Sequence, residues 1–569
     1  MGRDFSVSHA ILIDERPDGF RGVFRGDFLA RSLYAEAAGI ARLLPSAVAV
    51  PADVDDVSTL VRWATRGGVA LTARGSGSSM AGGALGPGVV VDLSRFASLG
   101  EVDVDGRWIR VGTGALRGAI DASARRHGLR FPVDPSSGAF CTIGGMIAAN
   151  AAGARTLRYG ATRRWVRALR CVFDDGQIAW IRRDAPLPME IPAVARLSAT
   201  LESMLESMRG RTDLSALRHH GVRKESSGYG LTDALAPNGH LLDLLVGSEG
   251  TLALFVEAEL MLCPIAGATA TVLASFPSLE RATSCAIGAR EFGASACELL
   301  DRTFLEVAAS DRSGGLPAAD VLTRSVPDGT EAVLLIEIEG EDASATGAAV
   351  EQLARDCRRY GALEVATAID AASEHRLWAL RHAASPILAR LAPRLRSMQF
   401  IEDGCVPPEH FPAYVRGVRD ALNRYDMPGV IFGHAGDAHA HVNPLVDVMR
   451  IGWRDRVRHL LDDVCALTAQ LGGTMSGEHG DGRLRAPLWS RIWSTTAQQA
   501  FVEVKRAGDP TGIFNVGCKV ARDGAQPIDQ LRYDPEAPGI DPSARATLDQ
   551  IERTRSWHHY RLDGVPPVA

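Results

Sequence analysis

The feature that most constrains this fold is a regular alternation of strand-like and helix-like segments that begins near residue 46. Residues 53–68 start with acidic side chains and end in Gly-Gly, which is typical of a helix. Residues 69–75 and 89–94 are rich in Val and Leu and are predicted to be strands. A further helix is predicted over 116–128. Strands that alternate with helices indicate an α/β unit.

Later segments extend this pattern through the 569 residues. Apolar residues recur at helical spacing over 184–225, strand character returns over 242–262, and a second α/β unit begins near residue 267. The Pro-rich, polar tail could wrap around the surface or remain mobile. The expected organisation is a helical lead-in at 1–45, a first domain at 46–265 with a helical insert at about 184–225, a second domain at 266–476, a returning segment at 477–521 and the tail at 522–569.

The composition argues against several classes of protein. Hydrophobic residues make up 46% and charged residues 23%, as in ordinary soluble globular proteins. A formal charge of −6 argues against nucleic acid or an anionic membrane as the main partner. There is no run of about 18 apolar residues that would predict a membrane span, and the N-terminus lacks the pattern of a signal peptide. We therefore expect a cytoplasmic protein, with peripheral attachment to a membrane left open.

The nine cysteines never form a CxxC pair. Scattered cysteines of this kind are typical of reduced cytosolic thiols rather than of a disulfide framework, a zinc site or an iron–sulfur cluster. Within these residues we therefore expect no iron–sulfur centre.

A Gly/Ser-rich loop at residues 72–83 lies between two predicted strands. Its small residues let backbone N–H groups approach an anion closely, and Ser76, Ser78 and Ser79 add hydroxyl donors. The alternative is a flexible surface turn, because one glycine loop is weak evidence. The loop is neither a GxGxxG fingerprint nor a P-loop, so sites for NAD and ATP are not supported.

A second tract of small residues runs from 134 to 153. Its glycines and alanines can pack closely against a large flat group or against another backbone. Close helix packing alone would explain the alanines, but it would not explain the hydroxyl-rich start at Ser136-Ser137. The second tract therefore strengthens the case for a bound cofactor.

Together with residues 158–163 and 245–252, the two tracts resemble the FAD-binding domain of the vanillyl-alcohol oxidase/p-cresol methylhydroxylase superfamily. The resemblance implies an α+β fold: a two-subdomain FAD-binding domain at 46–265 and an α/β substrate (cap) domain with an antiparallel sheet at 266–476.

In that superfamily the first loop cradles the pyrophosphate of FAD, and the second lies along the flavin and the ribityl chain. The first loop here contains no His or Cys to attach the flavin, so non-covalent FAD is expected. The residues that the resemblance assigns to FAD in these two loops are Arg74, Gly75, Ser76, Gly77, Ser78, Ser79, Gly82, Pro135, Ser136, Cys141, Gly144, Gly145, Asn150 and Gly153.

Four histidines lie in two Gly-rich segments, residues 432–443 and 476–483. In an extended chain His439, His441 and Asn443 point to one face. Imidazoles combined with a carboxylate and open positions make a divalent-metal site with room for a substrate. The alternative is that these histidines only bond to one another or cap loops.

The two segments resemble the GHxGDGNxHxN and SGEHGxG motifs of the D-lactate/D-2-hydroxyglutarate/glycolate dehydrogenase branch of the same superfamily. The resemblance implies that His479 is a general base and that Asn443 contacts substrate or metal. His439 follows Ala438 where the family has Gly-Asn, so this extra imidazole could join the metal shell or change the metal preference. The ligands that the resemblance implies for a Zn, Mn or Fe ion are His434, His441 and Glu478.

Two further motifs resemble the same branch. Residues 378–381 match W-x-x-R, whose arginine, here Arg381, holds the substrate carboxylate, a task that suits a bidentate guanidinium. The alternative is an arginine on a surface helix. The family's lysine is absent near residues 401–403, so the resemblance does not extend to recognition of a second carboxylate. Residues 509–519 resemble DPxGxxNPGK, in which the asparagine, here Asn515, lies near the flavin.

The resemblance covers roughly residues 45–535 and is nearest to the flavin half of members fused to an iron–sulfur half. It implies an FAD-linked dehydrogenase that oxidises a small D-2-hydroxy acid (D-lactate, D-2-hydroxyglutarate or a glycolate-like acid) to the 2-oxo acid. Hydride would pass to flavin N5 while a divalent metal assists.

Because cluster-binding cysteines are absent from these residues, the reduced flavin would need an external electron acceptor. An iron–sulfur protein, an electron-transfer flavoprotein, a cytochrome and a quinone-linked membrane complex remain open, as does a homodimer. Two other functions also remain open: an FAD-dependent alcohol or sugar oxidase that uses oxygen, and a non-catalytic flavin subunit of a larger complex.

Overall fold

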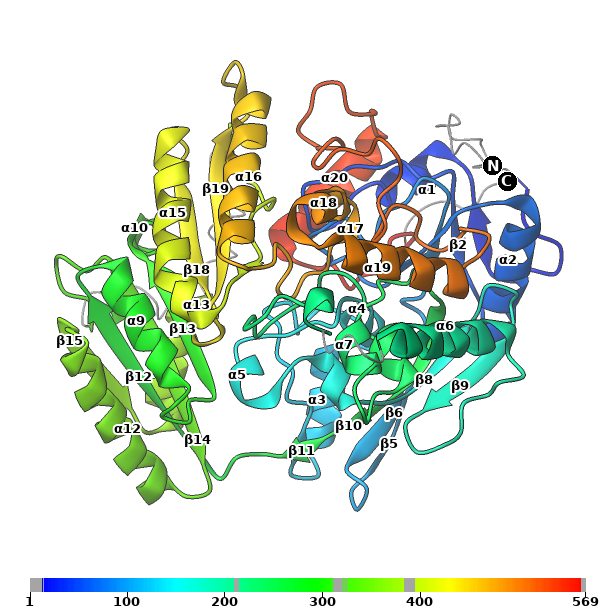
Figure 1. Cartoon of the computed structure of the whole chain (residues 1–569). Helices are drawn as coiled ribbons and strands as arrows, with labels where there is room; N and C mark the ends of the chain where they lie inside the picture. The colour runs from blue at the N-terminus through cyan, green and yellow to red at the C-terminus, as the bar shows by residue number, and fades with distance from the viewer. Residues whose placement is uncertain are drawn as a thin grey trace.

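The structure is a computed structural model in which two bodies of helices and sheets lie side by side (Figure 1). The first body holds most of the first half of the chain together with its C-terminal segment. The second is made by the middle of the chain. The structure describes residues 13, 15–208, 214–310, 321–322, 325–382 and 394–563.

The first domain begins with a four-stranded sheet in the order β1-β2-β4-β3. β2 (Ala47–Val50), β4 (Val89–Asp92) and β3 (Leu71–Arg74) run parallel, and helix α2 (Val54–Gly67) connects β2 to β3. β1 (Val23–Arg25) pairs antiparallel with β2, before the short helix α1 (Phe28–Leu33). The described part of the lead-in expected at 1–45 is therefore only partly helical, since β1 adds an edge strand whose Phe24 packs against Trp63 of α2.

A five-stranded antiparallel sheet completes the first domain, with α3 (Arg117–Arg125) and α6 (Pro192–Met208) beside it. The strands, in spatial order, are β5 (Leu99–Asp103), β6 (Trp108–Gly112), β10 (Leu254–Met261), β8 (Val166–Val172) and β9 (Ile178–Arg182).

Two expectations for this region need correction. The insert expected over 184–225 is helical only in α6 and in the single turn η2 (Leu214–Leu217), apart from residues 209–213, which lie outside the described part. Gly221, with a φ of 81°, takes a left-handed conformation that a helix does not allow. Residues 241–245 form helix α8 (Leu241–Leu245) rather than a strand, because the His240 side chain caps its first turn.

The second domain is built on an eight-stranded antiparallel sheet. One face packs with helices α9 (Leu279–Ala289), α12 (Ala343–Arg359), α15 (Phe411–Arg424) and α16 (Trp453–Gln470) in a single core. The other face packs with α10 (Arg302–Ser310) and α13 (Ala371–His382). The strands are β15 (Glu364–Ala368), β12 (Ala268–Phe276), β14 (Ala332–Gly340), β13 (Ala296–Asp301), β18 (Gly429–Gly433), β19 (His439–Asp447), β16 (Leu395–Ser397) and β17 (Gly404–Cys405).

The chain beyond the second domain returns to the first. Helices α17 (Gly482–Arg485), α18 (Trp489–Ile492) and α19 (Thr495–Gly508) follow, and α18 and α19 share a core with β8 and β10. Helix α20 (Pro542–Thr554) lies beside α1 (Figure 1). Of the two alternatives for the tail, its described residues therefore wrap around the first domain.

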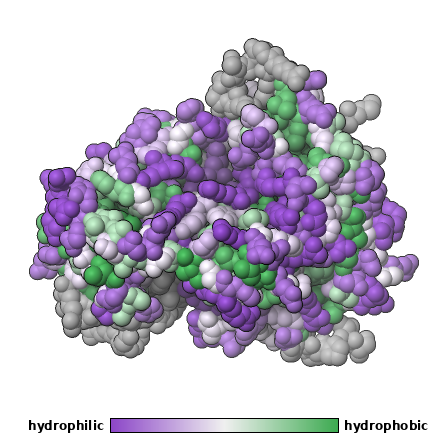
Figure 2. Space-filling model, turned by 90° about the horizontal axis from the view of Figure 1, so that it is seen from below, coloured by the Kyte–Doolittle hydropathy of each residue, from purple (hydrophilic) through white to green (hydrophobic). Residues whose placement is uncertain are grey.

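The face of the molecule seen in Figure 2 is mainly polar. Figure 2 shows one face on which hydrophilic side chains predominate and hydrophobic ones form separate patches. None of the helices in the described part of the chain combines the length and apolar character needed to cross a membrane.

Candidate active site

A cavity of about 1050 Å³ is lined by both domains and by the C-terminal segment. Its size suits a large cofactor together with a small substrate. Both glycine-rich tracts and the histidine-rich segments contribute to one continuous wall. The residues singled out from the sequence that line it are Arg74, Gly75, Ser76, Gly77, Ser78, Ser79, Pro135, Ser136, Cys141, Gly144, Gly145, Arg381, His434, His441, Asn443, Glu478 and His479.

The first loop uses its glycines for close approach and for an unusual backbone conformation. A Cβ atom on Gly75 would lie 2.1 Å from Oγ1 of Thr142 in the second loop. Gly77 has a φ of 76°, and its Cβ would lie 2.4 Å from Nη2 of Arg74. Arg74 is only 2% exposed, its Nη2 donates to the Glu36 carbonyl (2.8 Å), and its Nε has no hydrogen-bond partner. A buried cation behind a glycine loop fits an anionic group such as the diphosphate of FAD.

The second loop leads into helix α4 (Ile143–Ala149), which presents a small-residue surface to the cavity. A Cβ on Gly144 would lie 2.8 Å from the Cβ of Thr113, so glycine is needed for α4 to pack here. Burial raises the pKa of the Cys141 thiol to about 11, so a neutral thiol faces the cavity. This uncharged wall fits a flat, largely apolar ring system.

Some of the residues assigned to FAD from the sequence do not line the cavity. Asn150 Oδ1 accepts from the backbone N–H of Arg163 (2.9 Å), and Asn515 Nδ2 donates to the Glu249 carbonyl (2.6 Å). Both amides therefore fix neighbouring loops. The residues off the cavity wall are Gly82, Asn150, Gly153 and Asn515.

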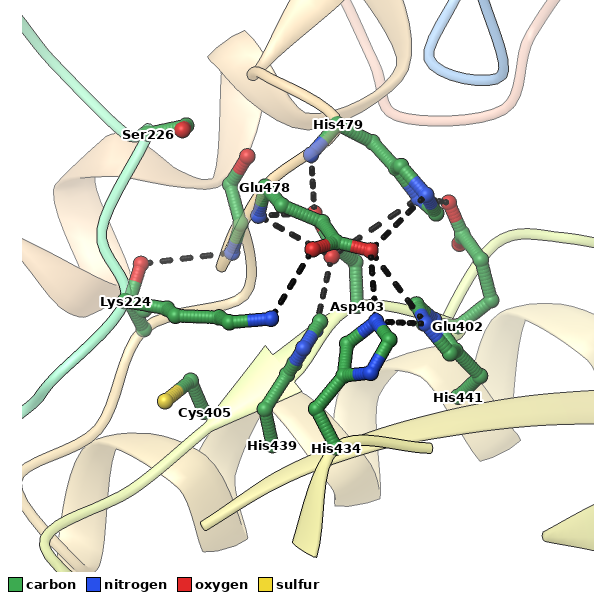
Figure 3. Close-up of polar contacts among 12 residues, drawn as sticks. Lys224, Ser226, Glu402, Asp403, Cys405, His434, His439, His441, Glu478 and His479 are labelled. Atoms are coloured by element: carbon green, nitrogen blue, oxygen red, sulfur yellow. Dashed lines mark hydrogen bonds and ion pairs between the residues drawn. The ribbon is translucent and has the colours of Figure 1, made fainter. Parts of the chain in front are cut away.

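Two histidines and one glutamate meet in the part of the site formed by the histidine-rich segments (Figure 3). His434 sits just after β18, and the η4 turn (Ala435–Asp437) brings the chain back into β19, which carries His441. The two Nε2 atoms are 3.4 Å apart, and Glu478 Oε1 lies 3.2 Å from the first and 3.3 Å from the second. All three side chains are buried. This donor set fits a divalent cation bound by two imidazoles and one carboxylate.

The outer nitrogen of each imidazole is held by a second group. His441 Nδ1 lies 2.9 Å from the Glu402 carbonyl, and His434 Nδ1 lies 2.6 Å from Oε1 of Glu298. A carbonyl can only accept, so His441 must carry its proton on Nδ1 and leave Nε2 free as a ligand. Burial alone would raise the pKa of Glu298, but His434 and Arg381 outweigh it and lower that pKa, so Glu298 is an anion.

Lys224 approaches the same carboxylate from the opposite side (Figure 3). Its Nζ lies 3.1 Å from Glu478 Oε2 and 3.7 Å from Oδ2 of Asp437. Burial would lower the pKa of Lys224, but these carboxylates raise it, and the pKa of Glu478 is lowered in turn. One oxygen of Glu478 is therefore neutralised by the lysine while the other faces the two imidazoles.

His439 lies in the same cluster but is directed elsewhere. Its Nε2 lies 2.9 Å from Asp403 Oδ1, and its Nδ1 has no hydrogen-bond partner. Burial lowers the pKa of His439 to about 3, so it is a neutral imidazole. Its ligand atom lies within 4.8 Å of those of His434, His441 and Glu478, which fits a third imidazole beside the cation site.

His479 is the most exposed of the four imidazoles, with 26% of its side chain accessible. Its Nδ1 lies 3.3 Å from Glu402 Oε1 and 3.7 Å from Asp403 Oδ1. Burial would lower its pKa, but Asp403 and Glu402 raise it to about 9. The proton shared with these carboxylates is therefore on Nδ1, which leaves Nε2 as the atom that can exchange a proton with a ligand in the cavity.

Arg381 lies on α13 and lines the same cavity. It is buried, its Nε donates to Glu298 Oε2 (2.5 Å), and its guanidinium lies 5.1 Å from the centre of the Phe432 ring. It is thus not on a solvent-exposed helix surface, which was the alternative interpretation. Asn443 lies two residues beyond His441 on β19, and both face the cavity.

The comparisons with known proteins agree with this site. Residues 45–182 match the family described as FAD binding domain, and residues 266–518 match FAD linked oxidases, C-terminal domain. The chain is 30% identical over 480 residues to the D-lactate dehydrogenase of Archaeoglobus fulgidus, covering 84% of this chain and 91% of the relative. The chain belongs to the family of FAD-linked oxidases. The resemblance to the D-2-hydroxy acid dehydrogenase branch is thereby confirmed.

Other members of the family are similar over much of the chain. It is 29% identical to the glycolate oxidase subunit GlcD of Bacillus subtilis over 85% of this chain and 91% of that one. It is 28% identical to the D-2-hydroxyglutarate dehydrogenase of Pseudomonas putida over 96% of this chain. The chain spans only about half (54%) of the length of that relative.

A solved structure confirms the predicted fold class. The 4-ethylphenol oxidase from Gulosibacter chungangensis superimposes with a TM-score of 0.60 at 14% identity, covering 89% of this chain and 94% of that one. At this identity the likeness concerns the fold alone.

Sequence reasoning missed Lys224 and Glu298, although both hold family motif residues in place. Glu298 carried a usable signal, since it is a carboxylate flanked on both sides by apolar residues of β13. Lys224 lies 254 residues before Glu478, in a polar segment with no recognisable pattern. The side chains that Glu298 and Lys224 contact could not be identified without the fold.

Proposed function

We propose that this protein oxidises a small D-2-hydroxy acid to the 2-oxo acid with non-covalent FAD and a divalent metal. The observation that carries the proposal is the convergence of the two glycine-rich loops with His434, His441, Glu478 and His479 on one cavity wall. Similarity to a D-lactate dehydrogenase and to D-2-hydroxyglutarate dehydrogenases supports the substrate class.

Different side chains bind the substrate, remove its proton and hold the metal. Arg381 binds the substrate carboxylate with the nitrogens that Glu298 leaves free, and Asn443 orients the substrate beside His441. His479 removes the hydroxyl proton at Nε2, because its Nδ1 is committed to Glu402. His434, His441 and Glu478 hold the metal.

The two bound groups supply what these side chains lack. When bound, FAD would take the C2 hydrogen of the substrate together with two electrons, as a hydride equivalent, while the hydroxyl proton goes to His479. A divalent cation held by His434, His441 and Glu478 would add positive charge that lowers the pKa of the substrate hydroxyl and of the neighbouring His479 imidazole. This second effect matters because the carboxylates around His479 otherwise hold its pKa near 9, at which the imidazole is mostly protonated at neutral pH.

The test is anaerobic bleaching of the flavin absorbance by a panel of D- and L-2-hydroxy acids. We expect at least one D-acid to bleach the flavin while its L-enantiomer does not. If the protein binds FAD but no D-2-hydroxy acid reduces it, the proposed function fails and a non-catalytic flavin subunit becomes the better interpretation.

We further propose that the electrons leave to an acceptor outside these 569 residues. The nine cysteines are free thiols, and in the described residues none belongs to a group that could hold a metal ion. Steady-state turnover in air should therefore be slow, and dichlorophenolindophenol should accelerate it. Fast peroxide formation without the dye would instead favour an oxidase.

A further inference from the structure

The C-terminal tail forms part of the cavity wall, although the family match ends at residue 518. Helix α20 packs against α1, and Ala544 and Leu562 are buried in a core with Leu33 and Val50. Tail residues both before and within α20, and beyond it, line the cavity, among them Arg532, Arg545, Glu552, Arg555 and Trp557. The tail is therefore fixed against the first domain at the rim of the FAD site.

Ion pairs neutralise the acidic side chains that α20 turns toward the cavity. Glu552 lies 2.8 Å from Nη2 of Arg532, and Asp549 lies 2.8 Å from Nη2 of Arg545. Arg545 also pairs with the buried Glu36 (2.8 Å). Both carboxylates are therefore paired with other arginines and not with Arg555, which ends the helix.

Arg555 ends α20 in a left-handed conformation (φ 55°), and its guanidinium lies 5.1 Å from the centre of the Phe140 ring in the second glycine-rich tract. Phe140 packs with Ile551 and Trp557 of the tail, so this contact is fixed. Among the described residues no carboxylate forms an ion pair with Arg555, and burial lowers its pKa. A partly buried cation thus faces the cavity without a counter-ion.

Arg561 places a second cation behind the first loop. It is only 4% exposed, its Nη2 donates to the Ser76 carbonyl (3.4 Å), and its Nη1 has no hydrogen-bond partner. Burial and the neighbouring Arg74 lower its pKa to about 9, and Asp92 offsets only part of this. Two buried guanidinium groups, Arg74 and Arg561, therefore lie close together at the first loop, and among the described residues no carboxylate forms an ion pair with either.

We propose that residues 555–561 form a cationic strap that binds the diphosphate of FAD, with Arg555 acting from the cavity wall and Arg561 from behind the first loop. The strap supplies the charges of Arg555 and Arg561, and the ring of Trp557 lies 5.1 Å from the Arg561 guanidinium. The diphosphate is the anionic part of FAD, and a desolvated guanidinium without a protein counter-ion is stabilised by such an anion. The inference rests on FAD binding and is independent of the substrate.

The experiment compares full-length variants prepared as apoprotein and titrated with FAD, with quenching of flavin fluorescence as the signal. Arg555→Ala should raise the Kd for FAD by about tenfold, the usual effect of losing one charge-assisted hydrogen bond. Arg561→Met should raise the Kd by a smaller factor, because the Arg561 charge acts on the diphosphate through the first loop. Arg555→Lys should recover part of the loss because it keeps the charge. Arg506→Ala, which removes an exposed arginine on α19, should leave the Kd unchanged.

Thermal melting separates this role from a structural one. The Arg561→Met apoprotein should melt no lower than the wild-type apoprotein, because it loses a buried charge that lacks a counter-ion. FAD should then raise its melting temperature less than it raises that of the wild type. Unchanged affinity for FAD in both variants, or an apoprotein that is itself destabilised by Arg561→Met, would overturn the proposal.

Discussion

Replacement of Glu298 by Gln should weaken metal binding without removing any metal ligand. Glu298 is fully buried on β13 and joins two functional side chains, with 2.6 Å to Nδ1 of His434 and 2.5 Å to Nε of Arg381. Glu298→Gln keeps the size of the side chain but removes its charge. The His434 imidazole then loses the anion that orients it and makes it more basic.

The expected magnitude follows from those contacts. Loss of such an outer partner typically weakens metal affinity by about 10–100-fold, which is roughly 1.4–2.7 kcal/mol. Breaking a buried ion pair also destabilises the fold by about 3–5 kcal/mol. Both effects should therefore appear together in Glu298→Gln.

Asp301→Asn is the matched control. Asp301 lies on the same strand, is also fully buried, and pairs with Arg419 outside the cavity. The assay is metal content after dialysis against a chelator of known affinity, with urea unfolding measured in parallel. We expect both variants to lose stability but only Glu298→Gln to lose metal. Equal metal retention by the two variants would refute the reasoning.

Three further variants test the other parts of the site. Gly77→Val should prevent FAD retention, because the new side chain would collide with Arg74 in the first loop. The control Gly524→Val is also at positive φ but has nothing within 4 Å of its Cβ, so it should retain FAD. Equal flavin content in the two variants would contradict this prediction. His479→Ala should lower the rate of flavin reduction by about 10²–10⁴ while FAD stays bound, and a normal rate would place the base elsewhere. Arg381→Lys should raise KM much more than it lowers kcat, because a single ammonium cannot replace the guanidinium fork; an unchanged KM would remove Arg381 from the substrate site.

Much of the framework could be predicted because it depends on short-range patterns. The Val-rich strands β3 and β4 and the acidic start of α2 follow directly from local sequence. The extended segment at 439–443 also agrees with β19, which places His439 and His441 in one cluster. These features need only the periodicity of a strand or a helix.

What could not be predicted depends on contacts between distant parts of the chain. Lys224 and Glu478 are 254 residues apart in sequence, and Arg561 and Ser76 are 485 apart. No local pattern relates such pairs, because the folding of the whole domain brings them together. Helix α8 was missed for a different reason: its five residues are too few to show helical periodicity, and a side-chain cap at His240 determines it.

The most direct test of the account is the rate of anaerobic flavin reduction in His441→Ala, measured by stopped flow with the D-2-hydroxy acid that reduces the wild type best. His441 is 3.4 Å from His434 and lies on the wall that also holds the flavin loops. If the metal site and the flavin site form one reaction chamber, the variant should keep its FAD, lose its metal and reduce its flavin at least about 100-fold more slowly. A metal-free variant that reduces its flavin at the wild-type rate would contradict the account.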